Sequence, residues 1–241
     1  MTLEMVGRLD PCVLIAYRAP AERLRPLLPP GLELLAHGSW AFLGVVVSRV
    51  RRMRPRGLPR ILGLSYGHVA YRLYARATLA DGRCVDGIHF LRSDVDSRLM
   101  SLGGNLLTEF RFHAGTVQLA SDAAGVALDV SSRDGGGDAH LRVSSGVADP
   151  AESCFASADE AARVLTYRPL GLACDGGVLK VAQVLRDEWR WRETPVHVEA
   201  ARWAFLERLG VPFHLERATR VEPIDYRWRL GGREQLAAKR T

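Results

Sequence analysis

Tyrosine, histidine and arginine side chains recur at alternate positions along residues 66–76. In a β-strand such positions share one face, which would carry Tyr66, His68, Arg72, Tyr74 and Arg76. A solvated sheet face usually carries Lys, Glu, Thr and Ser, whereas these side chains can bind an anion or exchange a proton. The pattern favours the polar wall of a cavity, with a solvated sheet face as the alternative.

Five side chains in and after this strand form the candidate catalytic set. His68 is the expected acid or base, and Tyr74 the expected hydrogen-bond donor. Arg72 and Arg111 would hold a carboxylate or an enolate. Glu109 would orient a neighbouring group, because a strand over residues 108–113 would place it on one face with Arg111 and His113.

A second set of side chains is expected to contact the substrate, and it comprises Tyr66, Arg54, Arg56, His89, His113 and Lys180. Lys180 lies between apolar residues of a predicted strand and is the only lysine outside the C-terminal tail. A buried amine at this position can form an imine with a ketone. The alternative, which we favour, is a lysine on the solvent side of a hairpin.

Two further chemistries have weaker support. His68, His89, His113 and Glu109 are of types that bind zinc or iron, but no HxH or HExxH spacing fixes such a site, so we expect no metal and no cofactor. Residues 63–67, Gly-Leu-Ser-Tyr-Gly, match the letters of a GxSxG nucleophile elbow. A strand rather than a helix is predicted to follow them, so the elbow is not expected.

Composition indicates an ordinary globular protein. The chain has 241 residues, of which 47% are hydrophobic and 25% charged. We therefore expect a single domain over residues 1–241, with a flexible tail at residues 231–241. No apolar run is long enough to cross a bilayer and no secretory signal begins the chain, so a cytoplasmic protein without a membrane partner is expected.

The cysteines and the charges narrow the range of partners. Cys12, Cys84, Cys154 and Cys174 are far apart without a CxxC pair, so free thiols are predicted. The formal net charge is +6, and residues 49–60 contain six arginines. No aromatic residue interrupts this cluster, so nucleic acid is not expected; a basic loop at the rim of a pocket is favoured, and an acidic protein partner is the alternative. The expected partner is a small molecule, with a homo-oligomer possible.

Many strands and a few short helices are predicted. Asp81-Gly82 indicates a hairpin between residues 66–80 and 83–92. Helices are expected at residues 20–28, at residues 99–102 behind a cap at Asp94, Asp96 or Ser97, at residues 157–165 behind a capping box, and at residues 196–209. Other strands are expected at residues 32–36, 40–50, 108–113, 117–119, 125–131, 140–143, 167–174, 178–191 and 217–230, with a mobile glycine loop at residues 134–138. This is an α+β fold whose antiparallel sheet can close into a cone-like barrel.

Four segments carry a resemblance to a known family. Residues 28–34 read LPPGLEL, residues 53–59 read MRPRGLP, residues 66–74 read Tyr-x-His-x-x-x-Arg-x-Tyr, and residues 87–99 read GIHFLRSDVDSRL. These segments resemble the YqjF-like family of unknown function, within the acetoacetate decarboxylase-like superfamily. The resemblance implies antiparallel sheet around a cone-like barrel, with a mostly apolar internal cavity that holds a few polar groups.

The resemblance also implies what this chain lacks. The decarboxylases of the superfamily use a Schiff-base lysine in a Gly-x-Pro-Lys-Lys segment, and the corresponding residues 105–111 contain no lysine. His68 stands where the family usually has the carboxylate of a Tyr-x-Glu pattern. We therefore expect a small-molecule enzyme of lyase-like or isomerase-like chemistry, acting on a carboxylated or ketonic metabolite through His and Arg side chains. The alternative is a non-catalytic binding domain with an internal cavity.

Overall fold

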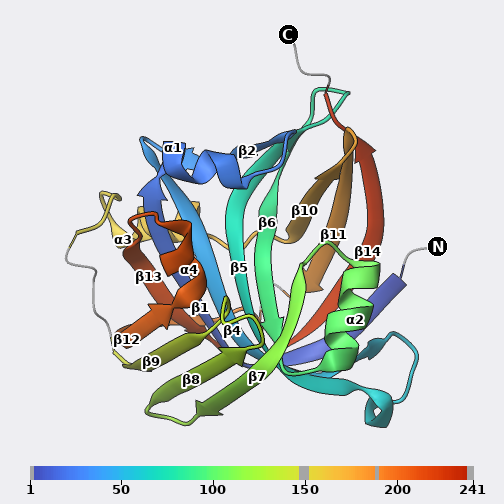
Figure 1. Cartoon of the computed structure of the whole chain (residues 1–241), viewed down its shortest axis with the longest axis vertical. Helices are drawn as coiled ribbons and strands as arrows, with labels where there is room; N and C mark the ends of the chain where they lie inside the picture. The colour runs from blue at the N-terminus through green and yellow to red at the C-terminus, as the bar shows by residue number, and fades with distance from the viewer. Residues whose placement is uncertain (1–2, 147–151, 188–189, 238–241) are drawn as a thin grey trace.

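The computed structural model describes residues 3–146, 152–187 and 190–237 (Figure 1). The strands are β1 Leu3–Pro20, β2 Leu32–Leu34, β3 Ala36–His37, β4 Trp40–Pro55, β5 Leu64–Thr78, β6 Cys84–Val95, β7 Phe112–Ser121, β8 Gly125–Ser132, β9 Ala139–Ser145, β10 Leu170–Asp175, β11 Val178–Arg186, β12 Glu193–Trp203, β13 His214–Val221 and β14 Ile224–Gln235. The helices are α1 Ala21–Leu24, α2 Arg98–Leu107, α3 Ala158–Val164 and α4 Ala204–Leu209, and the 3-10 helices are η1 Arg25–Leu27 and η2 Arg60–Leu62. The predicted α+β class, with mostly antiparallel sheet and a few short helices, is confirmed.

The strands form one sheet whose pairings close two rings. The first ring runs through β1, β13, β12, β9, β8, β7, β6, β5 and back by β4, which pairs with β1. The second runs from β1 through β14, β11 and β10 to β6, where Gly171 pairs with Ile88, and returns by β5 and β4. The rings share β1, β4, β5 and β6 as a common wall. This arrangement agrees with the predicted cone-like barrel.

β1 changes partner where the rings divide. One edge of β1 follows β4 along most of its length, while the other pairs with β14 over residues 3–9 and with β13 over residues 12–18. Asp10 and Pro11 separate the two stretches, and a proline has no N–H to give to a ladder. The charged and proline positions of residues 8–11 break the apolar pattern, and for this reason no element was predicted over residues 3–19.

The middle of the common wall, in β4 and β5, is covered on both faces. Residues 41–48 of β4 are all buried, as the uninterrupted apolar run of the sequence predicts. On β5, Val69, Tyr71 and Leu73 enter the largest core cluster, whereas Tyr66 and Ala70 belong to a second cluster. The alternation predicted for this strand is therefore confirmed, and the Asp81-Gly82 hairpin joins β5 to β6 as expected.

The helix predicted at residues 196–209 is wrong over most of its length. Its first part lies in β12, which pairs with β9 and β13, and only α4 is helical before Gly210 ends it with φ 59°. A register shift between Val198 and Ala200 interrupts the two-residue alternation of β12. The apolar spacing across that bulge therefore resembled the spacing of a helix.

The C-terminal third differs from the prediction in two further ways. Residues 217–230 fall in two strands rather than one, because β13 ends at Val221 and β14 begins at Ile224. Residues 231–235, expected in a flexible tail, continue β14 beside β11, and Leu236 bridges to Leu79. The end of that predicted tail, residues 238–241, lies outside the described residues.

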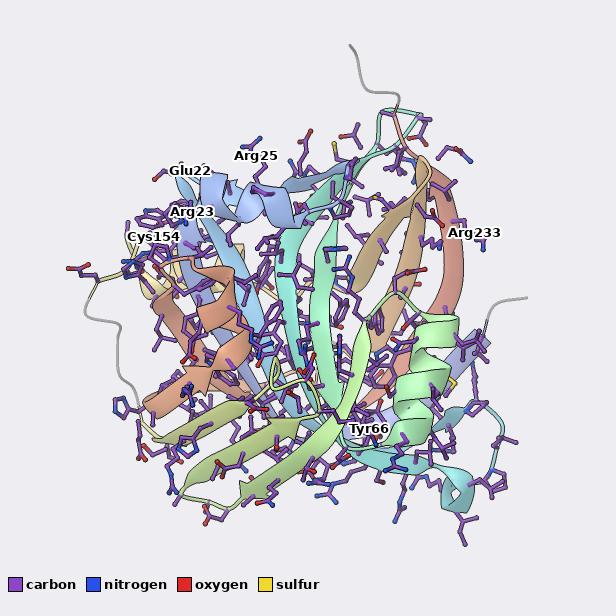
Figure 2. All side chains as sticks on the ribbon, in the orientation of Figure 1. Glu22, Arg23, Arg25, Tyr66, Cys154 and Arg233 are labelled. Atoms are coloured by element: carbon purple, nitrogen blue, oxygen red, sulfur yellow. The ribbon has the colours of Figure 1, made fainter. Side chains whose placement is uncertain are left out.

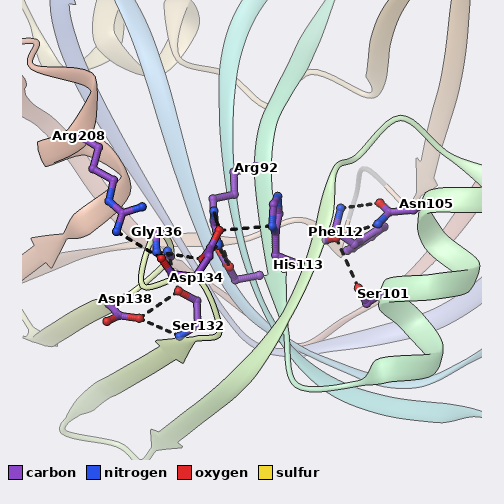
Figure 3. Close-up of polar contacts among 12 residues, drawn as sticks. Arg92, Ser101, Asn105, Phe112, His113, Ser132, Asp134, Gly136, Asp138 and Arg208 are labelled. Carbon is purple, nitrogen blue, oxygen red and sulfur yellow. Dashed lines mark hydrogen bonds and ion pairs between the residues drawn. The ribbon is translucent and has the colours of Figure 1, made fainter.

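Hydrogen bonds hold the glycine loop of residues 134–138, which was predicted to be mobile (Figure 3). Arg92 donates to both carboxylate oxygens of Asp134, at 2.8 and 2.7 Å, and to the buried carboxylate of Asp94. A Cβ on Gly137 would lie 2.2 Å from Asp94 Oδ1, so only glycine fits this approach. The loop is therefore part of a buried polar network, a role that its composition did not indicate.

Helix α2 is longer than predicted and is fixed to the start of β7. Of the three candidate caps, Asp94, Asp96 and Ser97, the helix uses Ser97, which accepts from the Met100 N–H at 3.2 Å. Asn105 then holds Phe112, accepting from its N–H at 2.7 Å and donating to its carbonyl at 2.8 Å (Figure 3). The helix continues through Gly103 and Gly104, and a Cβ on Gly104 would lie 2.4 Å from the Phe112 ring. Gly104 thus permits the close contact between α2 and β7.

The two helical glycines make a matched pair for testing this contact. We expect Gly104→Ala to lower the free energy of unfolding by about 1–3 kcal/mol, because the new methyl group would overlap the Phe112 ring. Gly103 has open space around its Cβ position, so Gly103→Ala should raise stability by up to about 1 kcal/mol through helix propensity. Urea unfolding of both variants measures the difference. Equal effects would show that α2 does not pack on Phe112 as described.

Candidate functional site

A cavity of about 270 Å³ lies among the strands of the second ring, with α2 at one side. Its lining is mostly apolar. The polar side chains along it are Ser48, Tyr66, His68, Arg72, Thr108, Tyr167, Tyr226 and Trp228. The apolar lining consists of Met5, Leu9, Leu14, Val50, Met53, Leu64, Ala70, Ile88, Phe90, Leu99, Met100, Gly103, Gly104, Leu107, Phe110, Phe112, Gly171, Val184 and Leu230. Such a site suits a small molecule with a large apolar part and one polar end.

His68 and Arg72 both reach this cavity from β5, four residues apart on one face. The His68 ring lies against Phe112 and Tyr66, with centroid distances of 5.7 and 6.4 Å. His68 Nε2 and Arg72 Nε are buried, and neither has a hydrogen-bond partner among the described residues. A buried polar atom left unsatisfied costs about 1–3 kcal/mol. The two atoms are therefore placed to bind a polar group of a ligand.

Burial and charge keep the imidazole neutral. Burial, and after it the positive charge of Arg72, lowers the pKa of His68 to about 4. Arg72 itself has no ion pair among the described residues. The nearby carboxylate of Glu193 accepts instead from Trp191, Arg217 and Thr219. At pH 7 the cavity thus presents one uncompensated guanidinium beside a neutral imidazole.

Tyr66 is a second donor on this wall. Burial, followed by the charge of Asp96, raises the pKa of Tyr66 well above its usual range, so the phenol stays protonated. Its side chain is buried and lines the cavity with His68. Figure 2 shows Tyr66 near the lower end of β5. β5 thus places a guanidinium, an imidazole and a phenol, which are groups able to hydrogen-bond an anion, beside a mostly apolar cavity.

Tyr74 and Arg76 continue this face of β5 but do not reach the cavity. The Tyr74 hydroxyl donates to the Leu165 carbonyl at 3.3 Å, and its ring packs against Phe42. Tyr74 and Arg72 border a separate small hollow of about 20 Å³. Arg76 forms an ion pair with Asp86 at 2.6 Å. Arg72 thus lies at the junction of the two spaces, and Tyr74 belongs to the smaller one.

The expected face of Glu109, Arg111 and His113 does not form. β7 begins only at Phe112, and Arg111 has a left-handed φ of 54°, so residues 108–111 are not a strand. Arg111 is exposed, and His113 Nδ1 lies 3.7 Å from Asp134. Neither side chain borders the cavity, so the structure does not bring them together with His68.

Lys180 occupies the solvent side of its hairpin. Its amine lies 2.8 Å from Glu109 and 3.0 Å from Asp175. Hydrogen bonds to Glu109 and then Asp175 raise the pKa of Lys180, so the amine stays protonated at neutral pH. Lys180 borders a separate hollow of about 200 Å³, which shares the stacked rings of Phe90 and Phe110 with the cavity. The buried, reactive amine considered as an alternative is not what the structure has.

The remaining candidate residues also lie elsewhere. His89 is buried, and its Nδ1 donates to the Leu172 carbonyl at 2.9 Å. Arg54 is held by the carbonyls of Leu58 and Arg52, both at 2.9 Å. Arg56 pairs with Glu4 at 3.3 Å. Of the eleven candidate catalytic and substrate-binding residues, Tyr66, His68 and Arg72 line the cavity.

Sequence reasoning missed most of the apolar wall. Leu9 and Leu14 come from β1, which was not predicted, and Trp228 comes from β14. Phe110 and Phe112 lie in the predicted strand of residues 108–113, in which only the polar residues Glu109, Arg111 and His113 were candidate site residues. Apolar residues that line a cavity have the same pattern as residues that fill a core, so the sequence contains no signal that separates the two.

The structure supports neither the metal site nor the GxSxG nucleophile elbow that the sequence analysis considered. Among residues 3–146, 152–187 and 190–237, no group of three or more His, Cys, Asp or Glu side chains could hold a metal ion. Ser65 Oγ accepts from the Arg52 N–H at 3.0 Å and lies on β5, so the GxSxG letters form part of a strand.

The cysteines are free, as predicted. None of the helices in the described part of the chain is long and apolar enough to span a bilayer.

Solved structures with a similar fold are acetoacetate decarboxylase-like proteins. An acetoacetate decarboxylase-like enzyme from Sphingomonas wittichii RW1 is 17% identical, with a TM-score of 0.58 over 98% of this chain and 93% of that one. The acetoacetate decarboxylase from Legionella pneumophila is 13% identical, with a TM-score of 0.57 over 100% of this chain and 88% of that one. The enduracididine biosynthesis enzyme MppR, complexed with the condensation product of pyruvate and imidazole 4-carboxaldehyde, is 15% identical. Its TM-score is 0.58 over 98% of this chain and 90% of that one. These likenesses define an acetoacetate decarboxylase-like fold.

Within that fold, the family follows from the sequence. The model of the DUF2071 family, described as an uncharacterized conserved protein (COG2071), matches residues 8–224, and the chain belongs to this family. No curated protein matches the chain. The resemblance to the YqjF-like family is thereby confirmed.

The lowered pKa of His68 predicts how stability depends on pH. An unfolded chain takes up this proton near pH 6.5, whereas the folded chain resists it until about pH 4. The unfolded state therefore binds more protons in this window, and stability should fall as pH falls through it, by about 3 kcal/mol from this group. Urea unfolding at several pH values between 4 and 7 gives the free energy of unfolding as a function of pH. This pH dependence should be weaker for His68→Leu than for the wild type. His197→Leu, a change at an exposed position, serves as the control and should keep the pH dependence of the wild type. An equal pH dependence of His68→Leu and the wild type would contradict the burial of the imidazole.

Proposed function

We propose that this chain is a small-molecule enzyme of the acetoacetate decarboxylase-like superfamily that acts on a carboxylated or ketonic metabolite with an apolar portion. The observation that carries the proposal is the uncompensated guanidinium of Arg72 beside the unsatisfied Nε2 of His68, in a cavity of about 270 Å³. A guanidinium binds a carboxylate through two parallel hydrogen bonds. The apolar lining would take the rest of the molecule.

The proposed chemistry is proton transfer next to a carbonyl group. Arg72 would hold the carboxylate or the developing enolate oxygen, and its positive charge would stabilise that oxygen. His68 would take the proton at Nε2. An anion bound beside the ring opposes the effect of Arg72, so binding should raise the pKa of His68 from about 4 toward neutrality and make it a better base. Tyr66 would donate a hydrogen bond. This chemistry corresponds to a lyase-like or isomerase-like reaction without a Schiff-base lysine.

A non-catalytic binding domain is the second candidate. The placement of Glu109, Arg111 and Tyr74 away from the cavity favours it, because fewer acid–base groups surround the ligand than the sequence suggested. The solved structure of MppR with pyruvate supports the same ligand class for either candidate, since pyruvate is a small 2-oxo acid. Measuring turnover distinguishes the two candidates. Both require Arg72 for binding, but only the enzyme requires His68 for exchange of the proton next to the carbonyl.

Arg72 and Arg76 provide a matched test of the anion site. Straight-chain carboxylates and 2-oxo acids are expected to raise the melting temperature of the wild type, whereas the corresponding alcohols are not. Arg72→Met should weaken carboxylate binding by about 10- to 100-fold, because a charged hydrogen bond in a buried site is lost. Arg76→Met, on the same strand but paired with Asp86, should bind as the wild type does. Equal affinity of the Arg72→Met protein and the wild type in calorimetric titration would reject the anion site.

Borohydride trapping tests whether an imine forms. Because the Lys180 amine is protonated and paired with Glu109 and Asp175, incubation with pyruvate or acetone followed by borohydride should leave Lys180 unmodified in peptide mass spectra. Lys180→Arg preserves the ion pairs and should retain the ligand affinity of the wild type. A stable adduct on Lys180 would instead favour Schiff-base chemistry.

A further inference from the structure

All of the large hydrophobic side chains that are exposed in the described part of the chain lie on two segments. Helix α2 contributes Leu99, Leu102, Leu106 and Leu107, which are 67%, 74%, 85% and 53% exposed. The second segment runs from the β4–β5 connection, which contains η2, to the first residue of β5, and it contributes Leu58, Ile61, Leu62 and Leu64, at 45%, 90%, 62% and 37%. Elsewhere in the described chain, the surface is free of such residues. This confinement is unlike the scattered single exposed residues of an ordinary surface.

These two segments meet at the mouth of the cavity. Leu64 at the start of β5, with Leu99 and Leu107 from α2, lines the cavity, and all three remain exposed to solvent. Figure 1 shows α2 and the β4–β5 connection on the same side of the molecule, away from β8 and β9. We call the eight exposed side chains of these two segments the apolar rim, of which Leu64, Leu99 and Leu107 border the cavity itself.

Arginines flank this rim. A hollow of about 880 Å³ beside the β4–β5 connection is lined by eight arginines and two aspartates. Glu4 is shared by Arg56 and Arg227, so it compensates only part of their charge. Arg54 is held by neutral backbone carbonyls, and no ion pair is formed by Arg52 or Arg60 within the described chain. Positive charge thus remains available directly next to the exposed apolar side chains.

The charge distinguishes among possible occupants of this surface. In a symmetric dimer, the same patch lies on both sides of the interface, which would bring the two arginine clusters close together. Nucleic acid would match the arginines but would leave the leucines and Ile61 in water. A bilayer with anionic lipids satisfies both features, because its headgroups attract arginine while its interface accepts projecting apolar side chains.

We propose that the apolar rim and its flanking arginines, here called the docking face, bind peripherally to the surface of an anionic membrane. Ile61, Leu62 and Leu106 enter the interface, and the arginines contact the lipid phosphates. The mouth of the cavity then opens toward the bilayer. If the cavity takes an apolar carboxylate, as the proposed function holds, that ligand would be an amphiphile drawn from the membrane; this last step rests on the proposed function, whereas docking does not.

Vesicle co-sedimentation of the full chain tests the docking face. The wild type should bind vesicles of phosphatidylcholine mixed with phosphatidylglycerol, bind phosphatidylcholine alone at least about tenfold more weakly, and lose binding as salt rises. Ile61→Ser with Leu62→Ser should lower binding by about tenfold or more, and the apolar exchange Ile61→Leu with Leu62→Met should retain it. Arg52→Gln with Arg60→Gln should also lower binding by about tenfold or more. Arg133→Gln with Arg142→Gln removes the same charge near β8 and β9 and should have no effect.

Three outcomes would overturn the docking face. One is an absence of binding to anionic vesicles, and another is binding that the serine and glutamine variants leave unchanged. The third is light scattering that shows a dimer of the wild type and a monomer of the serine variant, which would make this face an interface between two copies. Arg72→Met should bind vesicles as the wild type does, so failure of the anion site in the cavity and failure of the docking face are separable.

Discussion

The common wall of β1, β4, β5 and β6 is the constraint on which the rest of the molecule depends. Because these strands belong to two rings, both of their faces must be covered. One face of β5 supplies Val69, Tyr71 and Leu73 to a filled core, and the other supplies His68 and Arg72 to a cavity. The side chains of the candidate site are thus held by a strand whose position is fixed from behind by tight packing, as a binding site requires.

The electrostatics of the cavity follow from the position of His68 and Arg72 on the cavity face of β5. A charge in an apolar chamber interacts strongly with whatever else enters, because little water is present to screen it. Arg72 therefore lowers the pKa of His68, and the same guanidinium would attract an anion. The cost of leaving these two groups without protein partners is met by the packing of the opposite face, where Leu43, Val45 and Val47 of β4 join Val69, Tyr71 and Leu73 in the largest core cluster.

Local patterns in the sequence predicted local features well. The alternation of β5, the Asp81-Gly82 hairpin, the buried run of β4 and the capping residues Ser97 and Ser157 all appear in the structure. What failed depended on distant partners. The bulge in β12 imitated helical spacing, the charges of residues 8–11 hid β1, and Gly104 did not end α2 because Phe112 packs against it. Of the candidate residues, Tyr66, His68 and Arg72, whose relation a single strand defines, line one cavity. Glu109 and Arg111 do not line it, because a loop rather than a strand decides where these two side chains lie.

The two faces of β5 also differ in how freely they can change during evolution. A substitution at Val69, Tyr71 or Leu73 disturbs the interior that both rings require, so the fold restricts it. A substitution at His68, Ala70 or Arg72 alters only the wall of a partly empty chamber. One strand thus combines a face that packs into a filled core with a face that borders a cavity. A family built on this wall can acquire new ligands by exchanging every second residue of β5 while its architecture stays the same.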